Sequence, residues 1–194
     1  IEVGPLQQKG TDQEVVTQLG MWDVVDLGLL KMDFLGLRNL DVIDKAVDLI
    51  GGDLDIGTIP LDDRKVYEML ARADSAGVFQ FESSGMKDAL RQVKPTEFED
   101  LIALVALYRP GPMQYIPSYA ARKNGREPVT YIDERLKAIT GETYATCIYQ
   151  EQYLQIAKTM AGFTGAEAET LRRAIGKKIH ELMASLKPKF LDGC

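Results

Sequence analysis

GLLKMDFLGLRNL, residues Gly28–Leu40, is the stretch from which the rest of the sequence is interpreted. Apolar and charged residues alternate along it with the period of a β-strand, which predicts a strand over Leu29–Leu35. Lys31 and Asp33 would share one face of this strand, and a helix would begin near Arg38. The other face would carry, toward a core, the side chains of Leu30, Met32 and Phe34.

The pair Lys31 and Asp33 has two interpretations. Phosphoryl and nucleotidyl transfer need a carboxylate that holds a divalent metal and a cation near the phosphates, and a strand would fix both side chains. A more common arrangement is an exposed strand face that carries a surface ion pair. Spacing alone favours the surface ion pair, because solvated strand faces outnumber catalytic ones.

Length and composition indicate a globular protein with one large domain or two small ones. The sequence has 194 residues, of which 45% are hydrophobic, and it contains neither an apolar run of membrane-spanning length nor a signal-peptide pattern. Its first residue is Ile1 rather than Met, so we expect a piece of a longer protein. The two cysteines, Cys147 and Cys194, form no disulfide framework, which fits a reducing cytoplasm. A single histidine, His180, argues against a histidine-based metal site.

Charge is distributed unevenly along the chain. The net charge of −6 argues against a protein that simply coats DNA. Residues 1–100 carry 10 Lys/Arg against 20 Asp/Glu, whereas residues 101–194 carry 13 against 9. An acidic half and a basic end would suit metal chemistry at one place and phosphate binding at another, although such asymmetry is a weak indication of function.

Helical periodicity dominates the chain outside the central stretch. Apolar residues recur at helical spacing over residues 38–50, where Gly51-Gly52 ends the segment. Capping residues and apolar spacing predict further helices over residues 63–73, 84–93, 98–107, 117–126, 150–162, 165–175 and 179–186. Residues 14–18 suggest a short strand. The expected fold class is therefore α+β and mostly α-helical.

Local signals also predict where some of these helices begin and end. Thr96-x-x-Glu99 and Thr164-x-x-Glu167 are capping boxes, in which a hydroxyl and a carboxylate each accept from a backbone N–H of the first turn. Pro188 is expected to end the last helix, since proline cannot continue the hydrogen-bond ladder.

The main basic cluster is LRRAIGKK, residues Leu171–Lys178. Ala168, Leu171 and Ile175 would face the core. The segment carries four cations within seven residues, namely Arg172, Arg173, Lys177 and Lys178. Like charges this close repel one another unless a bound anion or solvent screens the repulsion. This segment is either a helix that grips a triphosphate or nucleic-acid backbone, for which Arg has the right fork geometry, or a solvated helix face.

Three further segments contain candidate residues, and for the first two the structural explanation is favoured. Arg109 precedes Pro110-Gly111-Pro112, a turn that could aim its guanidinium or merely leave it in solvent. Lys87 lies in the first turn of a helix whose hydroxyl-bearing start could bind an anion or simply cap the helix. Tyr149–Gln152 could touch a base or sugar, or cap the following helix.

Five segments in this order and spacing resemble the bacterial DNA polymerase III alpha subunit family, the C-family polymerases, from about Val15 to Lys178. They are KMDFLGLRNL, VFQFESSGMK, FEDLIALVALYRPGP, IYQEQ and LRRAIGKK. The resemblance implies that the central strand ends a palm of the nucleotidyltransferase kind related to polymerase beta, and that the helices after it correspond to the fingers. The family's PDFD-type motif, with two further catalytic aspartates, does not occur in residues 1–194.

The resemblance also implies a set of site residues. Asp33 matches the third of three metal-binding aspartates, and Lys31 matches a neighbouring phosphate-contacting lysine. We therefore expect Asp33 and Lys31 to be catalytic, with Asp33 as the metal ligand. Arg172 and Arg173 match paired arginines that hold the triphosphate of the incoming nucleotide, and Lys87 matches a further phosphate contact. With Lys177 and Lys178 of the basic cluster and Arg109 of the proline turn, which the residues themselves suggest, these are the expected nucleotide-binding residues.

We therefore expect residues 1–58, with the Asp33 strand and the helix 38–50, to be part of a palm domain, and residues 59–194 to be the helical fingers region. The full-length parent would be a DNA-directed DNA polymerase that adds deoxynucleotides to a primer 3′-end, using two Mg²⁺ ions at a site completed by residues outside this chain. The fragment alone would be inactive.

The expected partners are primer-template DNA and deoxynucleoside triphosphates, together with a sliding clamp and other replicase subunits that would bind regions not present here. No membrane association is expected, and the compartment would be the cytoplasm. The alternative is a non-catalytic helical module that binds phosphate or nucleic acid, in which Asp33 is structural.

Overall fold

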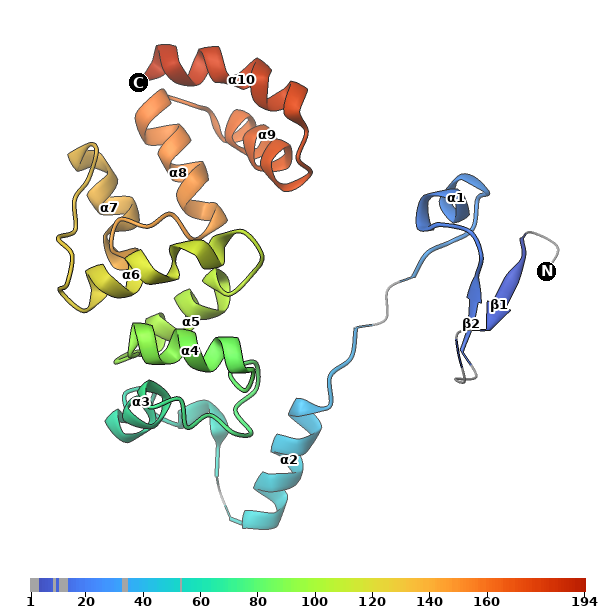
Figure 1. The fold of residues 1–194 in the computed structure, drawn as a ribbon, viewed down its shortest axis with the longest axis vertical. Helices are drawn as coiled ribbons and strands as arrows, with labels where there is room; N and C mark the ends of the chain where they lie inside the picture. The colour runs from blue at the N-terminus through green and yellow to red at the C-terminus, as the bar shows by residue number, and fades with distance from the viewer. Residues whose placement is uncertain (1–3, 9, 11–13, 33–34, 53) are drawn as a thin grey trace. The chain divides into compact units, whose positions relative to one another are not determined.

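A computed structural model describes residues 4–8, 10, 14–32, 35–52 and 54–194 of the chain. These residues form helices and one small two-stranded sheet, so the predicted fold class, α+β and mostly α-helical, is confirmed (Figure 1). The chain divides into two units, Ile1–Leu54 and Asp55–Cys194, which are described separately.

In its described residues, the first unit contains a pair of antiparallel strands and two helices. Strand β1 (Leu6–Gln8) pairs antiparallel with β2 (Val15–Thr17), and β2 confirms the short strand suggested for residues 14–18. Helix α1 covers Met21–Asp26, and α2 covers Asn39–Ile50, as predicted from its apolar periodicity. Gly51 ends α2 with a φ of +67°, a conformation that glycine adopts without a steric penalty.

The predicted strand over Leu29–Leu35 is wrong in its described part. Residues 29–32 and 35–37 have no strand structure, and Leu30 and Met32 are 82% and 60% exposed instead of facing a core. Asp33 and Phe34 lie outside the described residues. A strand is stabilised by backbone pairing with a neighbour, and in the described part of this unit the only sheet is the β1–β2 pair. The alternating segment therefore has no neighbouring strand to pair with among the described residues, and alternation alone does not make it a strand.

The second unit begins with a series of short helices. Asp63 accepts from the N–H of Lys65 to start α3, and Ser83 accepts from the N–H of Met86 to start α4, so a side-chain cap begins each of these predicted helices. The elements in chain order are η1 (Ile56–Thr58), α3 (Arg64–Ala71), α4 (Ser84–Val93), α5 (Phe98–Leu107), η2 (Pro112–Tyr115), α6 (Ile116–Lys123), η3 (Glu134–Leu136), α7 (Lys137–Thr140) and η4 (Gly141–Thr143).

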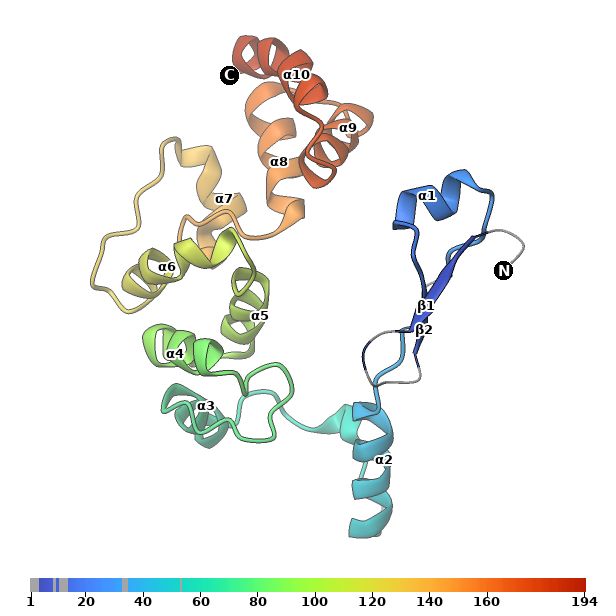
Figure 2. The same cartoon turned by 45° about the vertical axis from the view of Figure 1, so that its right-hand side comes forward.

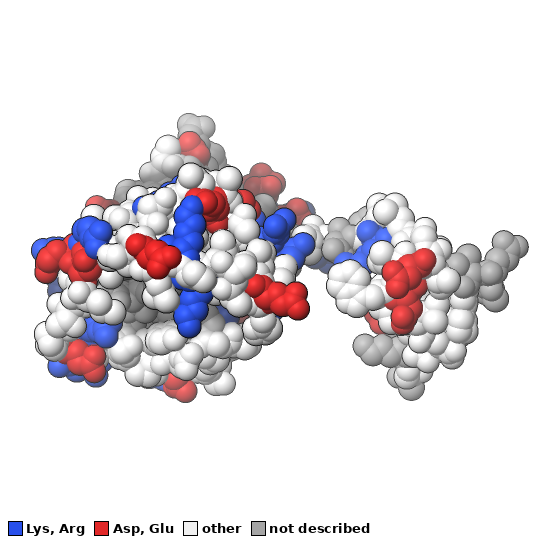
Figure 3. All heavy atoms as spheres, turned by 90° about the horizontal axis from the view of Figure 1, so that it is seen from above, with Lys and Arg blue, Asp and Glu red and all other residues white. Residues whose placement is uncertain are grey.

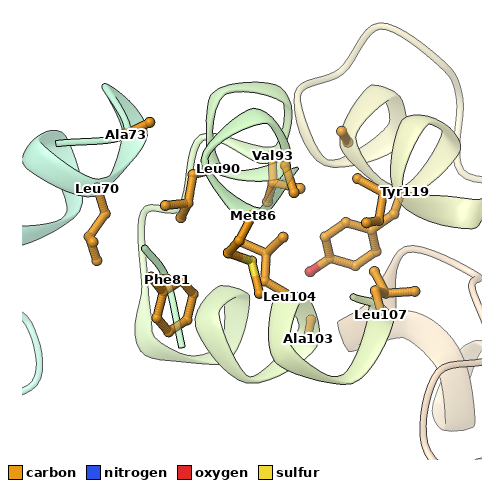
Figure 4. Close-up of a cluster of buried hydrophobic side chains, with 13 residues drawn as sticks. Leu70, Ala73, Phe81, Met86, Leu90, Val93, Ala103, Leu104, Leu107 and Tyr119 are labelled. Atoms are coloured by element: carbon orange, nitrogen blue, oxygen red, sulfur yellow. The ribbon is translucent and has the colours of Figure 1, made fainter. Parts of the chain in front are cut away.

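The core of this part lies between α3, α4, α5 and α6, which pack side by side (Figures 1 and 2). Figure 4 shows side chains of α4, α5 and α6 around Met86 and Leu104, with Leu70 of α3 on the side of Leu90 and Phe81. Tyr119 of α6 closes the core on one side and packs edge-on against Tyr144, with ring centroids 5.3 Å apart. The Arg109–Pro112 turn ends α5 as predicted.

A second, smaller core holds the last three helices together, namely α8 (Gln150–Ala161), α9 (Gly165–Gly176) and α10 (His180–Gly193). Its buried residues are Ala157, Ala161, Phe163 and Ala168. Contrary to the prediction, α10 continues through Pro188. An interior proline costs about 3 kcal/mol. Beyond it, however, Phe190 packs edge-on against Phe163 and Lys189 contacts Glu167, and these contacts hold the last turn in helical form.

Candidate functional site

The cluster LRRAIGKK lies on α9 and directly after it. The backbone N–H and hydroxyl of Thr164 donate to Glu167 Oε2 at 2.9 Å each, and the Glu167 N–H donates to Thr164 Oγ1 at 3.4 Å, which confirms the predicted capping box. Ala168 and Ala174 are fully buried, so α9 is anchored through small side chains.

One core prediction for α9 was wrong. Ile175 is 41% exposed, and Ala174 occupies the buried position at this end of the helix. Ile175 instead lines an apolar cavity of about 550 Å³ together with Met183 and Phe190 of α10. The side chains of Arg172 and Arg173 are left exposed, which fits either of the two interpretations of the basic cluster.

Arg172 has a carboxylate partner within α9. Its Nε lies 2.9 Å from Glu169 Oε2 and 3.0 Å from Glu169 Oε1, three residues earlier on the same helix face. This hydrogen bond lowers the pKa of Glu169 and raises the pKa of Arg172. An anion that binds Arg172 must therefore compete with Glu169.

The other cations of the cluster lie near the end of the helix. Lys177 is the C-cap residue and donates its backbone N–H to Arg173 O at 3.0 Å, and Lys178 follows with a φ of +53°. Within the described part of the chain, Arg173, Lys177 and Lys178 form no side-chain hydrogen bond or ion pair. Cations at a helix C-terminus are favoured by the helix dipole, so part of this clustering has a purely structural cause.

Lys87 and Arg109 belong to neighbouring elements of the first core. Lys87 is half-buried near the start of α4. The start of α4 lies close to the end of α5, because a Cβ on Gly85 would clash with the hydroxyl of Tyr108. Arg109 lines a cavity of about 430 Å³ together with Phe98 and Tyr149. Neither Lys87 nor the α9 cations line that cavity, so it does not unite the predicted nucleotide-binding residues.

The predicted metal site is not tested by the described residues. Lys31 is exposed, and Asp33 lies outside them. Among the described residues no group of three or more His, Cys, Asp or Glu could hold a metal ion. These residues therefore do not by themselves fit an Mg²⁺ site, and an Mg²⁺ role for Asp33 depends on sequence resemblance alone.

Gln152 acts as a cap, the structural one of the two interpretations of Tyr149–Gln152. Its buried side-chain carbonyl accepts from the N–H groups of Ile148 and Tyr149 at 2.7 and 2.9 Å, and its amide donates to Thr143 Oγ1 at 2.8 Å. Those bonds hold the segment that enters α8, and they leave the Gln152 amide unavailable for contact with a base.

Sequence reasoning missed Arg122 and Thr146, which line a polar cavity beside α6. In the sequence, Arg122 is one cation of a short basic helix, and nothing around Thr146 indicates a binding role. They are brought together by a hydrogen bond from the Arg122 side chain to the backbone, from Nη1 to Tyr144 O at 3.3 Å, between residues 22 positions apart. Contacts over such separations are not readable from local periodicity.

The surface charge around these sites is mixed. On the face of the second unit shown in Figure 3, Lys and Arg side chains are interspersed with Asp and Glu and with uncharged surface. No helix in the described part of the chain combines the length and apolar character needed to cross a membrane. A mixed surface is ordinary for a globular protein and does not point to one extended nucleic-acid groove on this face.

Comparison with known proteins identifies the family. The family profile for the bacterial DNA polymerase III alpha subunit finger domain matches residues 39–194. The chain is 45% identical over its whole length to DNA polymerase III subunit alpha of Bacillus subtilis, and 49% identical over 94% of its length to that of Thermus aquaticus. It spans 18% and 16% of the length of these relatives. The chain therefore belongs to the bacterial DNA polymerase III alpha subunit family and contains its finger domain.

Proposed function

We propose that this chain supplies part of the nucleotide-binding surface of a DNA-directed DNA polymerase that extends a primer 3′-end with deoxynucleotides. The observation that carries the proposal is Arg173, an exposed cation without an ion-pair partner in the described part of the chain. It lies on a capped helix inside the segment that matches the finger domain. Arg173 and its neighbours would bind the triphosphate of the incoming nucleotide.

The shape of the cluster favours a triphosphate over a DNA backbone. Arg172, Arg173, Lys177 and Lys178 lie within the last turns of α9 and the two residues after it, so they present one compact patch. A groove that tracks a nucleic-acid backbone needs cations spread along a longer path. The Glu169 bond to Arg172 would have to open, which leaves Arg173 as the cation that is ready to bind.

The remaining roles rest on the resemblance to the family, except that of Arg109, which rests on the proline turn that could aim its guanidinium. Asp33 would be one of several ligands of a two-ion Mg²⁺ site, with Lys31 beside the phosphates and Lys87 and Arg109 as further phosphate contacts. The other metal ligands, and the surfaces for a sliding clamp and other replicase subunits, would lie elsewhere in the parent, a cytoplasmic enzyme. The rival function is a non-catalytic helical module that binds phosphate or nucleic acid.

Replacing Arg173 with Ala in the full-length enzyme tests the triphosphate role. A charge-assisted hydrogen bond contributes about 1.5–3 kcal/mol, so efficiency of nucleotide use should fall roughly tenfold or more. Arg173→Lys should recover only part of this, because it keeps the charge and loses the fork geometry. The matched control is Arg64→Ala, an exposed arginine on α3 that pairs with Glu68 and should leave kinetics unchanged.

Steady-state kinetics with varied nucleotide, alongside a titration of primer-template DNA, separates the alternatives. Under the proposal, DNA affinity of the Arg173→Ala enzyme stays near that of the wild type while nucleotide use weakens. A loss of DNA affinity with an unchanged Michaelis constant and turnover for nucleotide would instead place α9 on the template.

A further inference from the structure

A polar cavity of about 380 Å³ lies between α6 and the segment that leads into α8. This segment passes beside α6 in both ribbon views (Figures 1 and 2). The side chains that matter in its lining are those of Tyr115, Ser118, Arg122, Thr146, Cys147 and Tyr153. The lining thus offers one guanidinium and several hydroxyls, and it contains no Asp or Glu.

Two buried polar atoms of residues that line this cavity have no hydrogen-bond partner among the described residues. They are Thr146 Oγ1, in a residue that is 6% exposed, and Arg122 Nε. A buried polar group without a partner costs about 1–3 kcal/mol, and natural proteins contain few of them. Both atoms belong to residues that line the same cavity, so one bound group could satisfy both.

Arg122 is held in place by its other contacts. Its Nη1 donates to Tyr144 O at 3.3 Å, while its Nε is 3.9 Å from Glu127 Oε2, too far for a hydrogen bond. Glu127 is half-exposed and is not part of the cavity lining. The guanidinium is therefore positioned, and it keeps a donor edge unused.

Thr146 lies on a backbone segment that is both fixed and strained. Tyr144 and Ala145 have φ values of +51° and +57°, a left-handed conformation that costs energy for residues with a side chain. The buried Thr143 hydroxyl donates to Thr146 O at 2.6 Å and fixes the position of the backbone of Thr146. The Thr146 hydroxyl is thus presented on rigid backbone.

We infer that this cavity binds a phosphate group, with Arg122 as the charged donor and the Thr146 hydroxyl as a second donor. Arg offers several N–H donors in the planar arrangement that suits phosphate oxygens, and hydroxyl donors complete such sites. The inference goes beyond the proposed function, because none of the residues assigned there lines this cavity. The phosphate could come from a free anion, such as phosphate or pyrophosphate, or from a DNA backbone.

Cys147 provides a readout inside the cavity, and exposed Cys194 provides a control in the same chain. Burial raises the pKa of the Cys147 thiol to about 11, so its alkylation is slow and is best followed at mildly alkaline pH. The rate of iodoacetamide labelling at each cysteine would be measured in the full-length polymerase by peptide mass spectrometry, at constant ionic strength set with chloride.

Inorganic phosphate, pyrophosphate and a DNA duplex form the three arms. Protection of Cys147, but not Cys194, by either free anion identifies that anion as the ligand, and protection by the duplex alone identifies a backbone phosphate. Protection should persist in the Arg173→Ala enzyme, which separates this site from the proposed triphosphate site. If none of the three slows Cys147 labelling, the inference is wrong.

Thr146→Val tests the site without removing any hydrogen bond that the structure contains. The concentration giving half-protection should rise roughly tenfold, as expected for loss of a donor to a charged group. Without phosphate the variant should be as stable as the wild type or more so, because an unpartnered buried hydroxyl is removed. Unchanged protection, or a lower melting temperature without phosphate, would show that the hydroxyl has another role. Arg122→Gln, which removes the charged donor, should abolish protection.

Discussion

Asp100 caps the start of α5, a role that the sequence assigned to its neighbour Glu99. The expected capping box was Thr96 with Glu99, but the carboxylate that accepts from the N–H groups of Thr96 and Glu97, at 2.8 and 3.3 Å, is Asp100. Asp100 is 1% exposed and lies 3.1 Å from Lys123 Nζ at the end of α6. Asp100 can be buried as the cap because Lys123 pairs with its carboxylate. This contact comes from another helix, so the capping pattern could not reveal it.

Replacing Asp100 with Ala should strongly destabilise the second unit. Removing one partner of a buried ion pair leaves the other charge uncompensated and costs about 3–5 kcal/mol. The control is Asp88→Ala, which breaks an exposed pair with Arg91 on α4 and should cost no more than about 1 kcal/mol. Urea unfolding followed by circular dichroism measures both, and equal losses in the two variants would contradict the buried-pair argument.

At the scale of elements, Glu167 joins the start of α9 to α10. Its carboxylate accepts from Lys189 and from the N–H and hydroxyl of Thr164, and these bonds lower the pKa of Glu167 from its ordinary 4.5 to about 2. Because the folded state holds the ionised form, this contribution to stability is complete above pH 4.5 and is lost as the pH falls toward 2.

Glu167→Gln should therefore be less stable than the wild type at neutral pH, and the difference should shrink as the pH is lowered from 4.5 toward 2. The variant loses the charge that pairs with Lys189 but keeps an acceptor for Thr164. Free energies of unfolding measured across this range test the prediction, with Glu181→Gln on exposed α10 surface as the control. A difference that does not vary with pH would mean that Glu167 acts through packing.

Helices that carry their own start signals were the predictable elements. Thr164 caps the helix that its capping box predicted, and Asp63 and Ser83 cap two other predicted helices, since a cap acts within four residues. Pro188 failed as a stop signal because Phe190 and Lys189 make contacts with residues more than twenty positions earlier. The predicted strand failed for a related reason, since strand pairing is also a long-range property.

At the scale of the whole chain, the sequence located parts of a candidate site but not its assembly. The four cations of LRRAIGKK fall on one helix end as predicted, because helical spacing is local. Arg109 lines a separate cavity beside Tyr149, and the Arg122–Thr146 cavity was not anticipated at all. The chain spans only 16–18% of the length of its relatives, so the proposed activity belongs to the full-length parent.

We propose that the other metal ligands lie elsewhere in the parent, so the purified 194-residue chain should not extend a primer. Mg²⁺ needs nearly octahedral coordination with oxygen ligands at about 2.0–2.1 Å. In the described part of the chain no cluster of three metal-ligating side chains exists, and Asp33 alone cannot form a two-ion site. Measurable primer extension by the chain alone would therefore overturn the assignment of the remaining ligands to other parts of the parent.

In the full-length enzyme, the metal role proposed for Asp33 predicts that Asp33→Ala reduces turnover by more than about 100-fold, because loss of a direct metal ligand should exceed the 10–100-fold effect of losing a residue that merely supports one. The control is Asp41→Ala, an exposed carboxylate on α2 of the same unit, which should leave turnover unchanged. Primer extension at several Mg²⁺ concentrations gives the decisive comparison. An Asp33→Ala enzyme with normal extension would mean that this carboxylate is structural, which is the rival function.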